Sequence, residues 1–274
     1  MNEIVHKILC AAIVLAFTAC NRPFVVVQIA DAQFGFTASE KALSEGKAYD
    51  NDVQYERDCL LKAVELINEI KPDAVVFTGD EVHHADNHHE WAAFKECVSA
   101  ISDDIELLYT SGNHDVLIKD GSVDTSPHDK YLGEGYFKHQ DRNVLLLGIN
   151  TNYIKYDDPR EQEQYAWIEQ TLEGNRDDNI LIFGHHPFFL ADIDEEDGYS
   201  QIQKCKRKRY FDLFGKYEVD AVFAGHLHNN AQGEYMGIPS ITTTSVAFQI
   251  GGPHPSIRVI TIDNGRMSSE LLPL

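Results

Sequence analysis

Five short polar clusters along the chain carry side chains suited to metal binding and hydrolysis. The clusters are Asp31-Ala32-Gln33, Gly79-Asp80, Gly112-Asn113-His114-Asp115, His185-His186-Pro187 and Gly225-His226-Leu227-His228. Together they offer carboxylates, amides and imidazoles, which are the ligands of hard and borderline metal ions. If one fold brings them together, the sequence predicts a two-metal hydrolytic site.

Nearly all of the clusters follow a short apolar run that is rich in β-branched or aromatic residues. The runs span residues 24–30, 74–78, 106–110, 180–183 and 221–224. Runs of this length and composition favour buried strands. Because open α/β sheets place their ligand sites beyond the carboxyl ends of the strands, we expect the clusters to meet at one sheet edge.

Helical patterns separate these predicted strands. Residues 52–70, 90–101 and 160–172 place apolar side chains at near-helical spacing. Strands that alternate with helices indicate an α/β layered core. The later apolar runs 241–246 and 257–262 have no helix between them, so we expect antiparallel pairing there and a mixed sheet or a two-sheet sandwich.

Length and charge narrow the class of protein. The chain has 274 residues, 43% of them hydrophobic, which favours one large α/β domain over two small ones. Its formal net charge of -21 argues against long contacts with nucleic acids or anionic lipids. An acidic surface that only maintains solubility would have the same charge.

The N-terminus has the pattern of an export signal over residues 1–19. Lys7 precedes the apolar stretch 8–17, which is too short to span a bilayer easily, and Thr18-Ala19-Cys20 follows. This pattern resembles a bacterial lipoprotein signal, which predicts a lipid on Cys20 and a mature domain of residues 20–274 in the bacterial cell envelope. Ordinary signal cleavage is the alternative, because Phe17 is unusual at its place in that pattern.

The remaining cysteines are Cys59, Cys97 and Cys205. Their scattered spacing matches neither a disulfide framework nor a zinc motif, so we expect them to pack in the core. A single disulfide in an oxidising compartment stays open.

In their order along the chain, the five clusters resemble the calcineurin-like metallophosphoesterase superfamily. That family shows D-x-H, G-D, G-N-H-D/E, a later His and G-H-x-H, and the match runs from Asp31 to His228. The opening Asp-x-Gln-Phe-Gly also resembles the subgroup that contains the calcineurin-like phosphoesterase domain-containing protein 1. The resemblance implies a four-layered α/β/β/α sandwich with mixed sheets and two metal ions at the sheet edge.

The resemblance also implies a division of the ligands. It assigns Asp31, Asp80 and His228 to the first metal, and Asp80, Asn113, His185 and His226 to the second. Chemistry agrees with this division, since the Asp80 carboxylate has two oxygens and can bridge, whereas Asn113 offers a neutral carbonyl oxygen. The ions implied are divalent or trivalent, with manganese, iron and zinc foremost.

Two positions leave alternatives open. Gln33 stands where the family has a histidine, which would give the first metal a weaker oxygen ligand. His83 occupies the place of a tyrosine ligand in purple acid phosphatases and is an alternative ligand that would compensate. In the pair His185-His186 the family's H-x-P context selects His185, with His186 in the pocket wall.

For the reaction, we expect in-line attack on phosphorus by a hydroxide that bridges the two metals. By family resemblance, His114 faces the substrate and protonates or stabilises the departing oxygen. We expect Asp115 to orient His114 and to favour its protonated form.

Four loops are candidates for choosing the substrate, at residues 34–49, 116–136, 152–160 and 188–209. Their aromatic residues can stack on a base or a sugar, or can simply pack the loops. These residues are Phe34, Phe36, Tyr131, Tyr153, Phe188 and Phe189. The basic cluster formed by Lys204 and residues 206–209 can meet a polyanion or can begin a solvated helix.

We therefore predict an exported, metal-dependent phosphoric ester hydrolase that acts on a phosphorylated small molecule or a phosphoprotein. A phosphomonoesterase is the first prediction, and a phosphodiesterase or nucleotide pyrophosphatase is the second. A catalytically silent, metal-dependent receptor for phosphorylated ligands is the third, because Gln33 departs from the family pattern.

Overall fold

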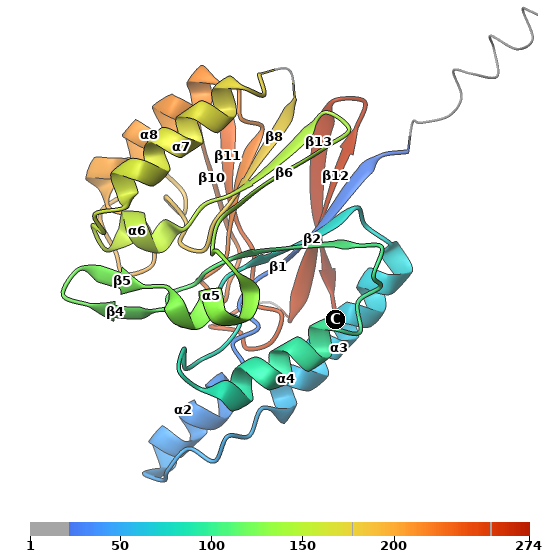
Figure 1. Ribbon diagram of the computed structural model, residues 1–274, viewed down its shortest axis with the longest axis vertical. Helices are drawn as coiled ribbons and strands as arrows, with labels where there is room; N and C mark the ends of the chain where they lie inside the picture. The colour runs from blue at the N-terminus through green and yellow to red at the C-terminus, as the bar shows by residue number, and fades with distance from the viewer. Residues whose placement is uncertain (1–21, 177, 253) are drawn as a thin grey trace, which may run out of the picture.

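Two β-sheets pack face to face in the computed structural model, which describes residues 22–176, 178–252 and 254–274 (Figure 1). The predicted export signal and Cys20 lie outside the described residues. The first sheet has the order β13-β12-β1-β2-β3, and the second has the order β10-β11-β9-β8-β7-β6. A separate pair of short strands, β4 and β5, forms a hairpin.

The strands are β1 (Phe24–Ile29), β2 (Ala74–Thr78), β3 (Glu106–Thr110), β4 (Leu117–Lys119), β5 (Ser122–Asp124), β6 (Phe137–Asp141), β7 (Val144–Gly148), β8 (Asn179–Phe183), β9 (Ala221–Ala224), β10 (Ala231–Tyr235), β11 (Ile238–Thr242), β12 (Ser256–Asp263) and β13 (Arg266–Pro273). The helices are α2 (Phe36–Glu45), α3 (Gln54–Ile70), α4 (His88–Val98), α5 (Ser126–Leu132), α6 (Thr151–Lys155), α7 (Glu161–Glu173) and α8 (Lys204–Lys216).

Helices cover the outer face of each sheet. α3 and α4 pack on the first sheet through a cluster that includes Leu60, Ile67 and Phe94. α7 and α8 pack on the second sheet through a cluster that includes Ile168 and Phe211. Between the sheets lies a third apolar cluster. The result is the predicted α/β/β/α sandwich with mixed sheets, which is confirmed.

Parallel pairing sets the edge that matters for function. β1, β2 and β3 are parallel neighbours, and so are β7, β8 and β9. Their carboxyl ends therefore gather at one side of each sheet, where polar loops begin. The five predicted strands match these elements to within a residue at each end.

The antiparallel pairing expected for the last two apolar runs is confirmed for the second run and only in part for the first, and the two runs lie in different sheets. The run 241–246 contributes to β11 in the second sheet, which pairs in parallel with β9 and antiparallel with β10. The run 257–262 lies in β12 of the first sheet, between β1 and β13, and both of its pairings are antiparallel. The chain crosses between the sheets after β11, and a crossover of this kind leaves no periodic signal.

Core packing, which was expected for all three described cysteines, is confirmed for Cys59 and Cys97 and was wrong for Cys205. Cys59 and Cys97 are buried in the cluster beneath α3 and α4, and Cys205 is exposed. All three are free thiols.

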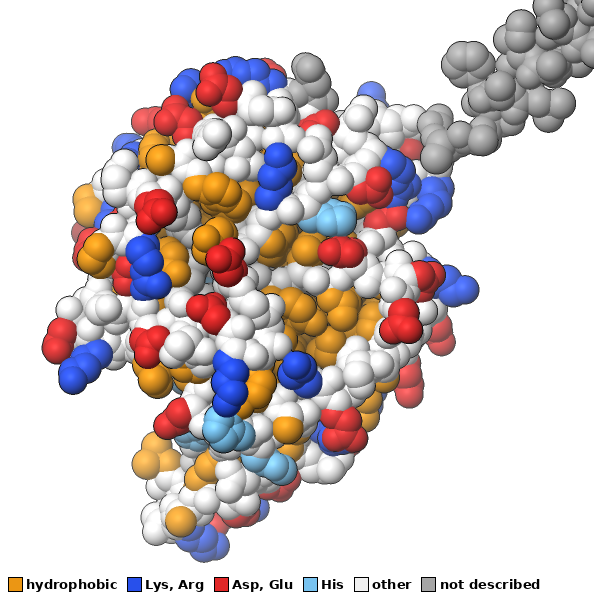
Figure 2. Space-filling model, in the orientation of Figure 1, with side chains coloured by type: hydrophobic (Ala, Val, Ile, Leu, Met, Phe, Trp, Pro, Cys, Tyr) orange, Lys and Arg blue, Asp and Glu red, His pale blue; other side chains and the backbone are white. Residues whose placement is uncertain are grey.

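Charged side chains of both signs are interspersed over the face that Figure 2 shows, so the negative net charge is spread out there. Among the residues that the structure describes, no helix combines the length and the apolar character that a membrane crossing requires.

The core between the sheets predicts a stability effect. Leu181 on β8 is fully buried between the sheets. Replacing it with alanine leaves a cavity, and we expect the free energy of unfolding in urea to fall by about 2–5 kcal/mol. Leu43 is 76% exposed on α2. Leu43→Ala is the control and should change this free energy by less than about 0.5 kcal/mol; equal effects of the two substitutions would contradict the assigned core.

Candidate metal centre

The predicted site residues lie just beyond the carboxyl ends of five strands. Asp31 follows β1, Asp80 follows β2 and Asn113 follows β3 in the first sheet. His185 follows β8, and His226 and His228 follow β9 in the second sheet. The site therefore lies where these ends of the two sheets meet.

The backbone is strained at this edge. Asp31, Gln33, Asp80, His226 and His228 have φ values of 52°, 41°, 54°, 71° and 49°. Residues with side chains rarely adopt this left-handed region, at a cost on the order of 1 kcal/mol each. So many outliers in the predicted clusters point to a functional constraint on the direction of the side chains.

Two glycines let the loops approach one another. A Cβ on Gly79, which has a φ of 84°, would lie 2.5 Å from the Gly112 nitrogen. A Cβ on Gly112 would collide with the Asp80 backbone and carboxylate. Larger residues at either position would push apart the loops that carry Asp80 and Asn113.

One group of ligand atoms surrounds the Nε2 atom of His185. This atom lies 3.2 Å from Asp80 Oδ2, 3.1 Å from Asn113 Oδ1 and 3.0 Å from His226 Nδ1. His185 Nδ1 donates to the Thr78 carbonyl at 2.9 Å, which leaves the lone pair on Nε2. With the His226 hydrogen on Nε2, four acceptor atoms converge, and a cation is the partner that would satisfy them together.

A second group forms around Asp31. His228 Nε2 lies 3.6 Å from Asp31 Oδ1, and His228 Nδ1 donates to the Phe248 carbonyl at 2.6 Å. Ligand atoms of Asp31, Asp80 and His185 lie within 4.8 Å of one another. Gln33 Oε1 is buried and has no hydrogen-bond partner among the described residues, so this oxygen is available to a metal ion. The residues present therefore fit two ions that share Asp80.

The protonation states reflect this crowding. Burial raises the pKa of Asp31 to about 6, although His228 and His185 oppose the shift. Burial also acts to raise the pKa of Asp80, but the His185, His114 and His226 imidazoles outweigh it and hold this pKa below its usual range. Burial acts to lower the pKa of His185, but Asp80 and Asp31 outweigh it and raise this pKa to about 9. Positive charge is therefore favoured where a cation would bind.

His186 lies closer to the ligand atoms around His185 than the sequence predicted. Ligand nitrogens of His185, His186 and His226 lie within 4.8 Å of one another. His186 Nδ1 lies 3.2 Å from Thr151 Oγ1, and burial holds the pKa of His186 well below its usual range. His186 is thus a neutral imidazole in the wall of the site.

His83 lies beside the site but outside both groups. Its ring stacks on His114 at 4.8 Å between centroids, and its Nδ1 lies 3.4 Å from Gln33 Nε2. The buried carboxylate of Glu90 accepts the backbone N–H groups of His83 and His84 at 3.0 and 2.7 Å. Sequence reasoning missed this role of Glu90, which holds the backbone of the His83 segment in place.

The structure corrects the expected role of Asp115. Its carboxylate makes no hydrogen bond with His114 among the described residues. Instead it accepts four backbone N–H groups, from Asp80, Glu81, Val82 and Gly112, at 2.7–3.2 Å. His114 Nδ1 donates to the His83 carbonyl at 2.9 Å, so backbone and not carboxylate orients this imidazole.

The aromatic residues of the four predicted loops fall into two groups: some are buried in the protein, and others lie close to the candidate metal centre. Phe34, Tyr153, Phe188 and Phe189 are buried, and Tyr131 stacks on Trp91. Of the predicted set, Phe36 approaches the site, with its ring 5.5 Å from that of His228. Sequence reasoning missed Tyr156 and Tyr199, whose rings lie 5.9 Å from His186 and 5.5 Å from His226.

The basic cluster on α8 is engaged in local contacts. Arg207 is fully buried and donates to the carbonyls of Ile193, Glu195 and Ile202. Lys206 pairs with Glu161, and Lys208 pairs with Asp194. These contacts favour the interpretation as a helix start over a polyanion site.

Comparison with known proteins agrees with this geometry. Residues 25–230 match the family model described as calcineurin-like phosphoesterase. The chain belongs to this family. The serine/threonine-protein phosphatase CPPED1 of Mus musculus is 31% identical over 255 residues, which cover 88% of this chain and 80% of the relative.

A second relative and a solved structure are also similar to this chain. The probable glycerophosphodiester phosphodiesterase GpdQ of Arcobacter nitrofigilis is 28% identical over 232 residues, covering 82% of this chain and 80% of the relative. A crystal structure of a dimetal phosphatase from Danio rerio shares the fold, with a TM-score of 0.59 at 16% identity over 92% of this chain and 99% of that chain. As a family member, the chain is a metal-dependent phosphoester hydrolase.

The hydrogen bonds of Asp115 predict that its loss lowers both the stability of the protein and its affinity for metal ions. Asp115→Ala removes the acceptor of four buried N–H groups, so we expect the free energy of unfolding in urea to fall by about 3 kcal/mol or more. Metal affinity, measured by calorimetric titration, should fall as well, because the Asp80 loop loses its support. The control is Asp103→Ala at an exposed position. Wild-type stability and wild-type metal affinity in Asp115→Ala would contradict this role.

Proposed function

We propose that the centre binds two metal ions that share Asp80. Asp31, Gln33, Asp80 and His228 would hold the first ion, and Asp80, Asn113, His185 and His226 would hold the second. The observation that carries the proposal is the convergence of Asp80 Oδ2, Asn113 Oδ1 and His226 Nδ1 within 3.2 Å of His185 Nε2. Mixed oxygen and nitrogen ligands suit manganese, iron and zinc.

Bound metal ions would supply a water of lowered pKa and would neutralise charge on the phosphoryl oxygens. The protein residues set the direction of proton transfer. Because His114 Nδ1 donates to a backbone carbonyl, its Nε2 is the atom that can give a proton to the leaving oxygen. The His114 backbone N–H donates to Asp80 Oδ1 at 2.8 Å, which ties this imidazole to the shared carboxylate.

The favoured substrate is a phosphomonoester, either a phosphorylated small molecule or a phosphoprotein. The similarity to CPPED1, whose name describes a serine/threonine-protein phosphatase, supports this choice over most of both chains. A phosphodiester is the second candidate. It is favoured by the similarity to GpdQ, which also spans four fifths of that relative.

The proposal predicts metal-dependent turnover that depends on Asp80. With manganese, iron(II) or zinc added to metal-free protein, we expect a chromogenic phosphomonoester to be hydrolysed faster than the corresponding diester in initial-rate assays. Asp80→Asn should lower the rate by at least about 1,000-fold, because both metal sites lose a charged ligand. Faster hydrolysis of the diester would favour the second candidate. A folded, metal-loaded protein without turnover would refute the hydrolase and favour a receptor for phosphorylated ligands.

His114 offers a separate prediction about proton transfer. We expect His114→Ala to lower kcat about 100- to 10,000-fold while the metal content, measured by elemental mass spectrometry, stays near that of the wild type. His139→Ala on β6, away from the centre, is the control and should retain full activity. Unchanged kcat in His114→Ala, or loss of metal in step with activity, would count against the acid role.

We also propose that residues 1–19 direct export, that Cys20 carries a lipid and that residues 20–274 form one catalytic domain in a bacterial envelope. The apolar stretch 8–17 and the small residues before Cys20 support this.

Lipid attachment predicts a shift in cell fractionation. When the full chain is expressed in a bacterium, we expect it in the membrane fraction, and Cys20→Ala should move it to the soluble fraction because the acylated thiol is lost. Cys205→Ala, at an exposed thiol, is the matched control. A Cys20→Ala protein that remains in the membrane fraction would rule out this anchor.

A further inference from the structure

An exposed aromatic ring lies next to the candidate metal centre. Tyr199, in the loop between β8 and α8, has its ring 5.5 Å from that of His226, with 33° between the two ring planes. Tyr199 is nevertheless 76% exposed. Covering an aromatic ring of this size is favourable, because it removes a large apolar surface from water. Tyr199 therefore offers an open, flat surface beside a candidate ligand of the second metal ion.

The loop that carries Tyr199 is held in place on both sides of this residue. The Lys155 ammonium group donates to the carbonyls of Gly198 and Gln201, at 3.3 and 2.5 Å. Gln203 Nε2 donates to the Lys155 carbonyl at 2.6 Å. These bonds join the loop to the end of α6. Backbone contacts thus fix the position of the Tyr199 ring, which does not have to be buried to stay there.

The segment that ends α6 places a second tyrosine close to the same point. Tyr156 is half-buried, and its ring lies edge-on to that of His186, at 5.9 Å between centroids. Burial raises the pKa of Tyr156 to about 12, and the nearby Tyr199 and Asp80 add to this shift. The Tyr156 phenol is therefore neutral at neutral pH and lies within electrostatic range of both groups. The two tyrosines together border the centre near the shared carboxylate.

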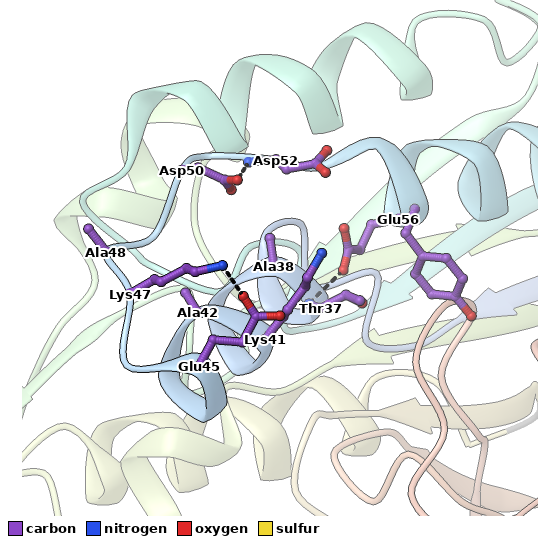
Figure 3. A pocket seen from close by; sticks show the side chains of 11 residues that line it. Thr37, Ala38, Lys41, Ala42, Glu45, Lys47, Ala48, Asp50, Asp52 and Glu56 are labelled. Carbon is purple, nitrogen blue, oxygen red and sulfur yellow. Dashed lines mark hydrogen bonds and ion pairs between the residues drawn. The ribbon is translucent and has the colours of Figure 1, made fainter.

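Phe36, another aromatic residue at the centre, is covered by neighbouring rings. Its ring lies 4.7 Å from that of Phe248, 5.2 Å from His83 and 5.5 Å from His228. Helix α2, which begins at Phe36, borders a hollow that is lined mainly by charged residues and alanines (Figure 3). An aromatic group on a bound substrate thus finds its open partner at Tyr199 and not along α2.

We propose that Tyr199 stacks on an aromatic group of the substrate, so that the centre binds aryl phosphates in preference to alkyl phosphates. This inference rests on the proposed function, in which the two metal ions hold the phosphoryl group. Aromatic pairs stack in offset geometry with centroids 4.5–7 Å apart, and the exposed face of Tyr199 permits such a pair. A phosphotyrosine side chain belongs to the preferred class. A phosphoserine or phosphothreonine side chain is an alkyl ester and lacks this contact.

The test is calorimetric titration of the manganese-loaded protein with phenylphosphonate and with methylphosphonate. Both compounds carry carbon directly on phosphorus and are not esters, so ester hydrolysis does not complicate the measurement. We expect phenylphosphonate to bind about three- to tenfold more tightly. Tyr199→Ala should abolish this preference by weakening the binding of phenylphosphonate alone. Tyr199→Phe keeps the ring and should keep the preference.

Leu43→Ala removes a side chain from a residue that is also 76% exposed, on α2, and is the matched control. It should bind both phosphonates like the wild type, and circular dichroism shows whether each variant is folded. The proposal is overturned if the wild type binds both compounds equally well or if folded Tyr199→Ala retains the preference. It is also overturned if Tyr199→Phe loses the preference, because the hydroxyl group would then be responsible.

The titrations also separate this proposal from the proposed function. Binding of methylphosphonate without a preference for the phenyl compound would refute the role of Tyr199 and leave the metal-bound phosphate site intact. Binding of neither compound would refute the phosphate site itself, and this proposal with it.

Discussion

The position of one buried carboxylate, Asp80, governs the rest of the site. Its Oδ2 faces His185, its Oδ1 accepts the His114 backbone N–H, and Asp31 lies close by. Burying acidic groups together is costly unless positive charge compensates them. The His185 imidazole supplies part of that charge, and the geometry leaves the remainder to bound cations. Every other feature of the site serves to bring these groups to the same place.

The backbone around Asp80 is held by groups that do no chemistry. Asp115 gathers the N–H groups of two loops, and Glu90 does the same for the segment at His83. Gly79 and Gly112 permit a close approach that no side chain would allow. These contacts offset the cost of left-handed conformations at the candidate ligands. The sandwich thus provides rigid strand ends, and the loop contacts fix the direction of each ligand.

The sequence allowed much of this arrangement to be predicted, because apolar runs and polar clusters are local signals. The layers, the five strands beneath the site and the convergence of the clusters follow from those signals. The crossover after β11 and the acceptor role of Asp115 depend on which backbone groups meet in three dimensions. Helix α2 lay within a segment expected to be a loop, because its lack of buried residues leaves only a weak periodic pattern. Tyr156 and Tyr199 reach the rim only through the fold of their loops.

The central claim is that Asp80 is shared by two metal ions. Anomalous X-ray diffraction from crystals of the manganese-loaded protein tests it most directly. The account predicts two anomalous peaks, one beside Asp31 and His228 and one beside Asn113, His185 and His226, with a carboxylate oxygen of Asp80 in contact with each. A single peak, or two peaks of which only one contacts Asp80, would contradict the account.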